Sequence, residues 1–137
     1  MLFNKQRSHI ETVNDIDKEI VNFFRILRDR SDELEHAIYF TPFSRSEYKA
    51  AYESSYDDLE RARCFAGKCW MGFGCGNLYQ NGFKSGQQTK SPNPARAWNE
   101  LPETMKLAVE RLKGVQIENL PALELIERYN TEDVFIY

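Results

Sequence analysis

Two polar residues each close a short β-branched run, and their side chains suit the binding of a nucleoside. Asp15 follows the run HIETVN (residues 9–14), and Asn119 closes the run VQIEN (residues 115–119). In open parallel sheets ligands bind at the carboxyl ends of the strands, where an acidic residue commonly accepts hydrogen bonds from a ribose. Asp15 is therefore a candidate ribose ligand. The alternative is structural, because Asp15, Asp17 and Asn119 are also residue types that cap a following helix.

A second group of residues could meet phosphates. From Arg61 to Asn99 the chain has six basic residues and no acidic one, so the remaining segments sum to −9 within a net charge of −3. The basic residues are Arg61, Arg63, Lys68, Lys84, Lys90 and Arg96, and the aromatic residues beside them include Tyr79, Phe83 and Trp98. Cations that neutralise phosphates, next to rings that stack on bases, are typical of a nucleic-acid surface. The alternative is a solvated basic loop whose aromatic side chains fold back into a local core.

Other kinds of chemistry find no support in the sequence. Cys64, Cys69 and Cys75 are spaced like no zinc motif, His9 and His36 lie far from them, and reduced thiols are expected. The chain has no G-x-G-x-x-G, no P-loop and no arrangement around a histidine that resembles a catalytic triad. We therefore predict no metal site and no catalytic residue.

The elements that would position these residues are mainly helices. The strand at 9–14 runs directly into an amphipathic helix at 15–30, and a second helix opens at Ser31. A third begins at the capping box of Ser44 and Glu47, and a fourth runs from about 55 to 71. The apolar stripe of this fourth helix assigns Trp70 and Phe73 to the core.

The second half of the chain returns to alternating elements after a long loop at 72–94, which is rich in Gly, Asn, Gln and Ser. A helix is predicted from about 101 to 112, with Pro102 in its first turn. The strand at 115–119 follows, then a helix at 121–128 with Leu123 and Ile126 facing inward. A third strand, VFIY, is predicted at 134–137.

These elements predict a mostly helical α/β chain with a partial parallel sheet of about three short strands. With 42% hydrophobic and 28% charged residues, the composition is that of a globular protein. No apolar run reaches the roughly 18–20 residues that cross a bilayer, and the N-terminus has no signal-peptide pattern. We expect a cytoplasmic protein with no membrane partner.

Several segments together resemble phage-type (Dam-like) DNA adenine methyltransferases, over nearly the whole chain. They are VNDIDKEIVNFFRILRDR, TPFSRSEYKAAY, ERARCFAGKCWMGFG and LPETMKLAVERLKGVQIENLPALELIERYNTEDVFIY. The resemblance implies a Rossmann-like methyltransferase sheet interrupted by a helical target-recognition insert. It also implies methyl transfer from S-adenosylmethionine to the exocyclic amine of adenine in double-stranded DNA, with the base flipped out of the stack.

The resemblance also implies roles for segments and residues. Residues 1–30 and 114–137 would be parts of the catalytic domain, and 31–113 would be the recognition insert, with its loop at 72–94. Asp15 and Ile16 would contact the ribose and adenine of the cofactor, and Glu118 and Asn119 would line the same pocket. The candidates for contacts to DNA phosphates or bases are Arg45, Lys68, Lys84, Lys90 and Arg96.

The sequence departs from the family pattern in two motifs. A family member would place F-x-G-x-G just upstream of the segment at 2–5, and Asp-Pro-Pro-Tyr directly after VFIY, and neither motif is present. We therefore expect a fragment that keeps DNA recognition, binds S-adenosylmethionine weakly or not at all, and is inactive alone. In a family member the glycine motif follows a central strand of the sheet. Because this sequence lacks that strand, we predict that the strands at 9–14 and 115–119 stay neighbours. VFIY would then dock elsewhere or pair with another copy.

Two other functions remain open. The chain could be a non-catalytic DNA-binding module of phage origin. It could also be an interaction protein whose acidic flanks and open sheet edge recruit a second chain, or a second copy through the C-terminal strand.

Overall fold

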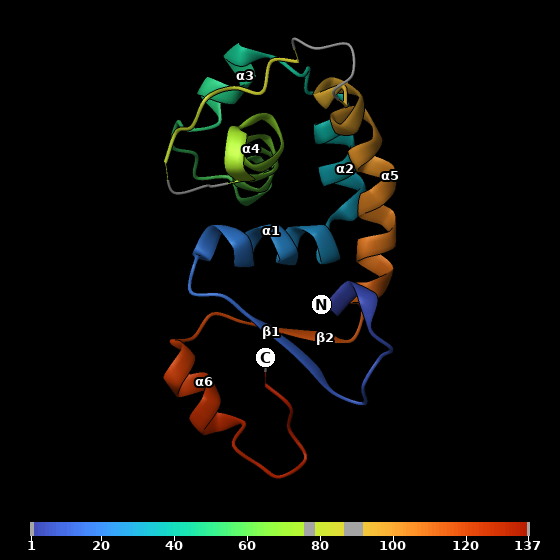
Figure 1. The fold of residues 1–137 in the computed structure, drawn as a ribbon, viewed down its shortest axis with the longest axis vertical. Helices are drawn as coiled ribbons and strands as arrows, with labels where there is room; N and C mark the ends of the chain where they lie inside the picture. Colours follow the sequence, from blue (N-terminus) through green and yellow to red (C-terminus); the bar gives the residue numbers. More distant parts are fainter. Residues whose placement is uncertain (1, 76–78, 87–91, 137) are drawn as a thin grey trace.

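The computed structural model describes residues 2–75, 79–86 and 92–136. Figure 1 shows helices α1 to α5 on one side of a small sheet, with α6 and the C-terminal segment on the other side. The elements are η1 (Leu2–Asn4), β1 (Glu11–Asn14), α1 (Lys18–Asp29), α2 (Ser31–Tyr39), α3 (Arg45–Ala50), α4 (Asp58–Met71), η2 (Phe73–Cys75), α5 (Pro94–Leu112), β2 (Val115–Glu118) and α6 (Ala122–Arg128). The prediction of a mostly helical α/β chain is confirmed.

The sheet consists of β1 and β2, which pair in parallel with Glu11 opposite Val115 and Asn14 opposite Glu118. The predicted pairing of the two runs is therefore confirmed. Asn14 extends the pairing past the strand ends, because its side chain donates to the carbonyl of Leu120 (3.0 Å) and accepts from the amide of Leu120 (2.8 Å). This holds the two carboxyl ends side by side.

The predicted third strand is wrong for the residues that the structure describes. Val134, Phe135 and Ile136 are in no strand and are 42%, 83% and 47% exposed, and Tyr137 lies outside the described residues. A turn precedes them, with the amide of Val134 bonded to the carbonyl of Thr131 (3.2 Å). A β-branched run becomes a strand only where another strand offers free backbone groups, and here the segment bonds to its own turn.

Helix α6 is also packed differently from the prediction. None of its residues is buried, and Leu123 and Ile126, which were expected to face inward, are 76% and 42% exposed. The apolar side of α6 therefore lacks a covering element within the described chain.

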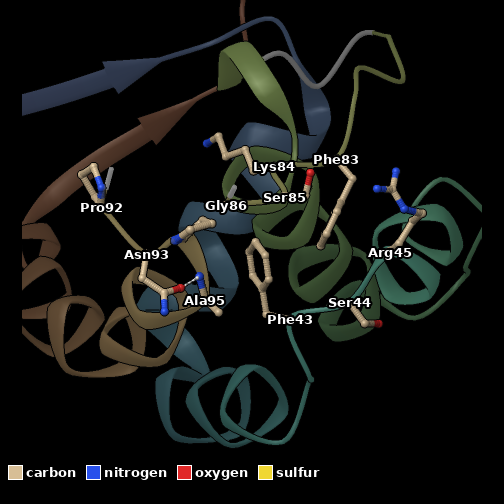
Figure 2. A pocket seen from close by; sticks show the side chains of 11 residues that line it. Phe43, Ser44, Arg45, Phe83, Lys84, Ser85, Gly86, Pro92, Asn93 and Ala95 are labelled. Carbon is tan, nitrogen blue, oxygen red and sulfur yellow. Dashed lines mark hydrogen bonds between the residues drawn. The ribbon is translucent and has the colours of Figure 1, made fainter. Parts of the chain in front are cut away.

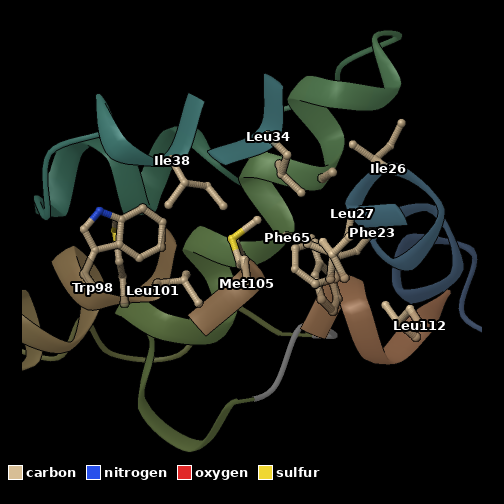
Figure 3. Close-up of a cluster of buried hydrophobic side chains, with 14 of the residues drawn as sticks. Phe23, Ile26, Leu27, Leu34, Ile38, Phe65, Trp98, Leu101, Met105 and Leu112 are labelled. Atoms are coloured by element: carbon tan, nitrogen blue, oxygen red, sulfur yellow. The ribbon is translucent and has the colours of Figure 1, made fainter. Parts of the chain in front are cut away.

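The hydrophobic core lies between α1, α2, α4 and α5 (Figure 3). Leu34, Ala62, Ala66, Met71 and Leu112 have no exposed surface, and Phe23 packs on Phe65 with ring centroids 5.2 Å apart. The buried cluster includes residues of all three predicted segments, among them Phe23, Leu34 and Val115. The division at 30 and 113 remains a prediction about sequence organisation.

Three aromatic assignments from the sequence are wrong. Trp70 and Phe73 were assigned to the core and are 36% and 56% exposed, because α4 turns Ala62, Phe65 and Ala66 inward instead. Trp98 was grouped with the surface that meets bases, and it is 2% exposed in the core.

Helix α5 begins at Pro94, seven residues before the predicted start. The side chain of Asn93 accepts from the amides of Ala95 (3.0 Å) and Arg96 (3.4 Å), and Pro94 occupies the first turn, where it needs no amide. Pro102 therefore lies inside the helix. This longer helix carries Trp98 into the core.

A buried carboxylate ties the N-terminal residues to the end of α5. Glu11 is 8% exposed and binds both Arg111, at 2.5 and 2.8 Å, and Lys5. The hydrogen bond from Arg111, followed by that from Lys5, holds the pKa of Glu11 far below its usual range. Arg111 also donates to the carbonyl of Leu2 (3.0 Å), so one guanidinium joins β1, η1 and α5.

No helix among the described residues is both long and apolar enough to span a bilayer.

Candidate nucleic-acid interface

Most cations in the described chain are neutralised by ion pairs, but four that lie near one another are not. Arg61 binds Glu19 (2.6 Å), and Arg63 binds Glu60 (2.5 Å). Of the six described lysines and arginines that make no ion pair, four lie in this part of the fold: Arg45 and Lys49 in α3, Lys68 in α4, and Lys84 in the segment after α4. These four are called the basic end. Elsewhere in the described residues only Lys18 and Arg7 have no carboxylate as an ion-pair partner, and Arg7 donates to backbone carbonyls.

Two cations of the basic end lie over rings of an aromatic cluster formed by Phe43, Tyr48, Tyr52 and Phe83. Ring centroids are 5.0 Å apart for Phe43 and Phe83, 6.0 Å for Tyr48 and Phe83, and 5.4 Å for Tyr48 and Tyr52. The guanidinium of Arg45 lies 5.0 Å from the centroid of Phe83, and the ammonium of Lys68 lies 5.1 Å from that of Tyr52. These contacts fix the direction of two cations without neutralising them.

The two tyrosines of the cluster hold the segment that carries Lys84. The hydroxyl of Tyr48 donates to the carbonyl of Asn81 (2.7 Å), and that of Tyr52 to the carbonyl of Tyr79 (3.4 Å). Burial and the hydroxyl of Tyr48 raise the pKa of Tyr52 well above its usual value, so that it stays a donor. The amide of Lys84 is bonded to the carbonyl of Met71 (2.8 Å), which completes the attachment to α4.

A cavity of about 550 Å³ opens beside the aromatic cluster (Figure 2). Its lining comes from three parts of the chain: Phe43, Ser44 and Arg45; Phe83, Lys84, Ser85 and Gly86; and Pro92, Asn93, Pro94 and Ala95. No acidic side chain is among these described residues. The ring of Phe43 lies between Ala95 on one side and Phe83 on the other, with Arg45 beyond Phe83. The cavity thus combines cations, hydroxyls and aromatic walls.

A polar network holds two walls of this cavity in place. The indole of Trp98 donates to the carbonyl of Thr41 (2.7 Å), which joins α5 to the turn that leads to Phe43. Arg63 donates to the hydroxyl of Thr41 (3.1 Å) and binds Glu60 through two nitrogens, at 2.8 and 2.5 Å. The hydrogen bonds to Glu60 raise the pKa of Arg63, and Arg63 in turn lowers the pKa of Glu60. The network sets the position of the cavity without contributing to its lining.

The predicted DNA-contacting residues are partly brought together. Arg45, Lys68 and Lys84 meet around the aromatic cluster. Arg96 lies in the first turns of α5, close in sequence to the cavity lining, but binds Glu100 (2.9 Å). Lys90 lies outside the described residues. Sequence reasoning missed Lys49, although its spacing of four from Arg45 places both on one side of a helix.

The four predicted cofactor contacts lie together at the carboxyl edge of the sheet. Asp15 and Ile16 follow β1, Glu118 ends β2, and the side chain of Asn119 donates to the carbonyl of Asp15 (2.6 Å). One carboxylate oxygen of Asp15 accepts from the amide of Asp17 (2.9 Å), as the structural alternative expected, and Asp17 caps α1. Ile16 is 70% exposed, and Glu118 faces Arg128 at 3.6 Å.

The thiol of Cys64 is not activated as a nucleophile. Burial raises the pKa of the Cys64 thiol to about 11, and its sulfur lies 3.4 Å from a carboxylate oxygen of Glu60. A thiol with a raised pKa is a poor nucleophile. No group of three His, Cys, Asp or Glu side chains in the described residues is placed to hold a metal ion.

No protein-family model matches the chain, and the curated proteins compared with it include no match.

Proposed function

We propose that the chain binds double-stranded DNA through the basic end, as the recognition part of a DNA adenine methyltransferase. The proposal rests on positive charge that no carboxylate of the described residues neutralises. Arg45, Lys49, Lys68 and Lys84 gather at one end of a chain whose net charge is −3, while carboxylates pair with most other cations of the described residues. The family assignment is supported by the sequence resemblance, and the parallel pairing of β1 with β2 agrees with a Rossmann-like arrangement.

DNA is the anionic partner that fits this surface best. Cations that neutralise phosphates release condensed counterions, and each such contact adds about 0.9 to the slope of log affinity against log salt concentration. Up to four contacts from the basic end would give a slope of roughly −2 to −4. Affinity of this kind is sequence-independent and typically in the range of about 1–100 μM at physiological salt.

Fluorescence anisotropy with a labelled duplex of about 20 base pairs, read at several salt concentrations, tests the proposal. Lys84→Gln is expected to weaken binding several-fold and to reduce the salt slope by about 0.9. Lys113→Gln is the matched control, because Lys113 follows the opposite end of α5, which is roughly 28 Å long, and pairs with Glu110. Absence of binding at low salt, or equal losses in both variants, would contradict the proposal.

A second candidate function is weak binding of S-adenosylmethionine at the carboxyl edge of the sheet. Asp15 and Asn119 support it, because they lie next to each other where parallel sheets bind nucleosides. The carboxylate of Asp15 has one oxygen turned to the amide of Asp17 and keeps a second for a ribose, and exposed Ile16 could pack on adenine. These residues fit the adenosine part only. The cofactor would supply the methyl group, and transfer would need groups that these 137 residues do not contain.

Isothermal titration with S-adenosylmethionine tests this second function. Binding is expected to be no tighter than millimolar, and Asp15→Ala is expected to abolish it. Asp32→Ala, an exposed aspartate in the first turn of α2, is the control and should bind like the unmodified chain. Micromolar binding that depends on Asp15 would mean that the site is more complete than proposed. Association through the C-terminal residues stays a prediction.

A further inference from the structure

Helix α6 and the segment after it expose apolar side chains on the far side of the sheet from α1 to α5 (Figure 1). Leu123 and Ile126 are 76% and 42% exposed, and their spacing of three places both on one side of the helix. Val134 and Ile136 follow in the next segment and are also exposed. Apolar side chains exposed together are typical of a surface that contacts another molecule.

Carboxylates lie among these apolar residues. Glu127, Glu132 and Asp133 make no ion pair with any described residue. Arg128 is the single cation between 114 and 137, and it already faces two neighbouring carboxylates at 3.6 and 3.7 Å. The three carboxylates and the four apolar residues are together called the C-terminal surface. This surface suits a partner that is both apolar and basic.

The basic end has the complementary character. Lys68 and Lys84 make no ion pair with a described residue, and the rings of Phe73 and Tyr79 are exposed in the same part of the fold. The amide of Phe73 donates to a carbonyl of the segment 79–86, which carries Lys84 (2.9 Å). The carbonyl of Tyr79 accepts from the tyrosine whose ring lies under Lys68. Cations and exposed rings are therefore neighbours here, as the C-terminal surface requires of its partner.

The two surfaces lie at opposite ends of the molecule. Figure 1 shows α3 and α4 on one side of α1 and the sheet, and α6 with the segment after it on the other side. A chain therefore cannot join its own two surfaces, and the contact must form between two molecules.

We infer that this protein associates with itself head to tail, with the C-terminal surface of one copy on the basic end of the next. The opposite charges orient the two copies, and the apolar side chains are removed from water. The inference does not rest on the proposed DNA binding, because it uses the same cations without a phosphate. Each contact would cover cations that DNA needs, so a second copy and DNA compete for the basic end.

Sedimentation velocity of the full chain at concentrations from about 10 μM to 1 mM tests the inference. A head-to-tail contact leaves one free surface at each end, so species larger than a dimer are expected as the concentration rises. Raising the ionic strength from about 0.05 to 0.5 M should weaken the association several-fold, because salt screens the opposite charges.

Two variants each remove one of the surfaces. Leu123→Lys places a cation on the C-terminal surface, and Lys84→Glu places a carboxylate on the basic end. Each is expected to weaken self-association at least about tenfold. An equimolar mixture of the two should form a one-to-one dimer and nothing larger, because each variant supplies the surface that the other lacks. Leu107→Lys is the matched control, since Leu107 is 74% exposed in α5 outside both surfaces, and it should associate like the unmodified chain.

Three results would overturn the inference. They are a sedimentation coefficient independent of concentration, association that stops at a dimer, and a mixture of the two variants that associates no more than either alone. The last two would point to a symmetric contact between identical surfaces. Failure of duplex DNA to bind would contradict only the proposed function, because self-association is measured without DNA.

Discussion

Replacing Trp98 with alanine is expected to lower the free energy of unfolding by roughly 3–5 kcal/mol, the usual cost of truncating a buried large aromatic residue. Trp98 is 2% exposed and packs in the core shared by α2, α4 and α5 (Figure 3). Its indole also donates to the carbonyl of Thr41, which the substitution leaves without that partner. Urea unfolding followed by far-ultraviolet circular dichroism measures the loss without relying on tryptophan fluorescence.

Two companion variants separate packing from hydrogen bonding. Trp98→Phe keeps most of the ring and loses the donor, so a cost of about 1–3 kcal/mol is expected. Trp70→Ala removes the other tryptophan, which is 36% exposed, and should cost much less. An unfolding free energy for Trp98→Ala no lower than that for Trp70→Ala would show that the burial of Trp98 is wrongly described.

The second large effect is expected for Arg63→Met, at about 1–3 kcal/mol of unfolding free energy, because charged hydrogen bonds are lost and their carboxylate partners stay. Arg63 has a side chain 16% exposed and bonds to Glu60, Glu47 and the hydroxyl of Thr41. Methionine keeps much of the side-chain volume, so the loss of unfolding free energy measures the contribution of the polar contacts. Both carboxylates are partly exposed, at 33% for Glu47 and 40% for Glu60, and solvent screening favours the lower part of that range.

Arg30→Met is the matched control for this prediction. Arg30 binds Glu33 through two nitrogens, at 2.8 and 2.6 Å, with the same spacing of three residues that separates Arg63 from Glu60. The Arg30 pair is more exposed, so solvent competes for both charges and no measurable change in unfolding is expected. Equal losses for Arg63→Met and Arg30→Met would mean that the Thr41 network adds nothing to stability.

The sequence predicted the helices that are set by residues close to them in the chain, such as capping residues. Ser44 caps α3 by accepting from the amide of Glu47 (3.1 Å), as the S-x-x-E spacing indicated. The helices predicted at 15–30, from Ser31 and at about 55–71 are present, each within a few residues of its predicted bounds. The start of α5 was missed, although Asn93 followed by Pro94 is also a local signal, because the prediction gave Pro102 the role that Pro94 has.

Burial and strand formation could not be predicted in the same way, because both depend on what lies opposite. The segment at 134–137 has strand-forming residues, yet Val134, Phe135 and Ile136 are in no strand of the described chain. Trp98 and Phe73 lie in the same glycine-rich and aromatic stretch, and only the packing of α5 against α2 buries one and leaves the other 56% exposed. Side-chain type alone does not decide which aromatic residue reaches the core.

The candidate interface, too, could be predicted from the sequence only in part. The sequence by itself determined that 61–99 holds six cations and no acid, and that Asp15 and Asn119 each close a β-branched run. Only the tertiary structure decided which cations stay uncompensated. Carboxylates outside that segment neutralise Arg61 and Arg63, while Arg45 and Lys68 lie over rings of the aromatic cluster and Lys84 lines the cavity beside it. The physical reason is that Coulomb attraction depends on separation in space, and the fold brings Glu19 to Arg61 across 42 positions of sequence.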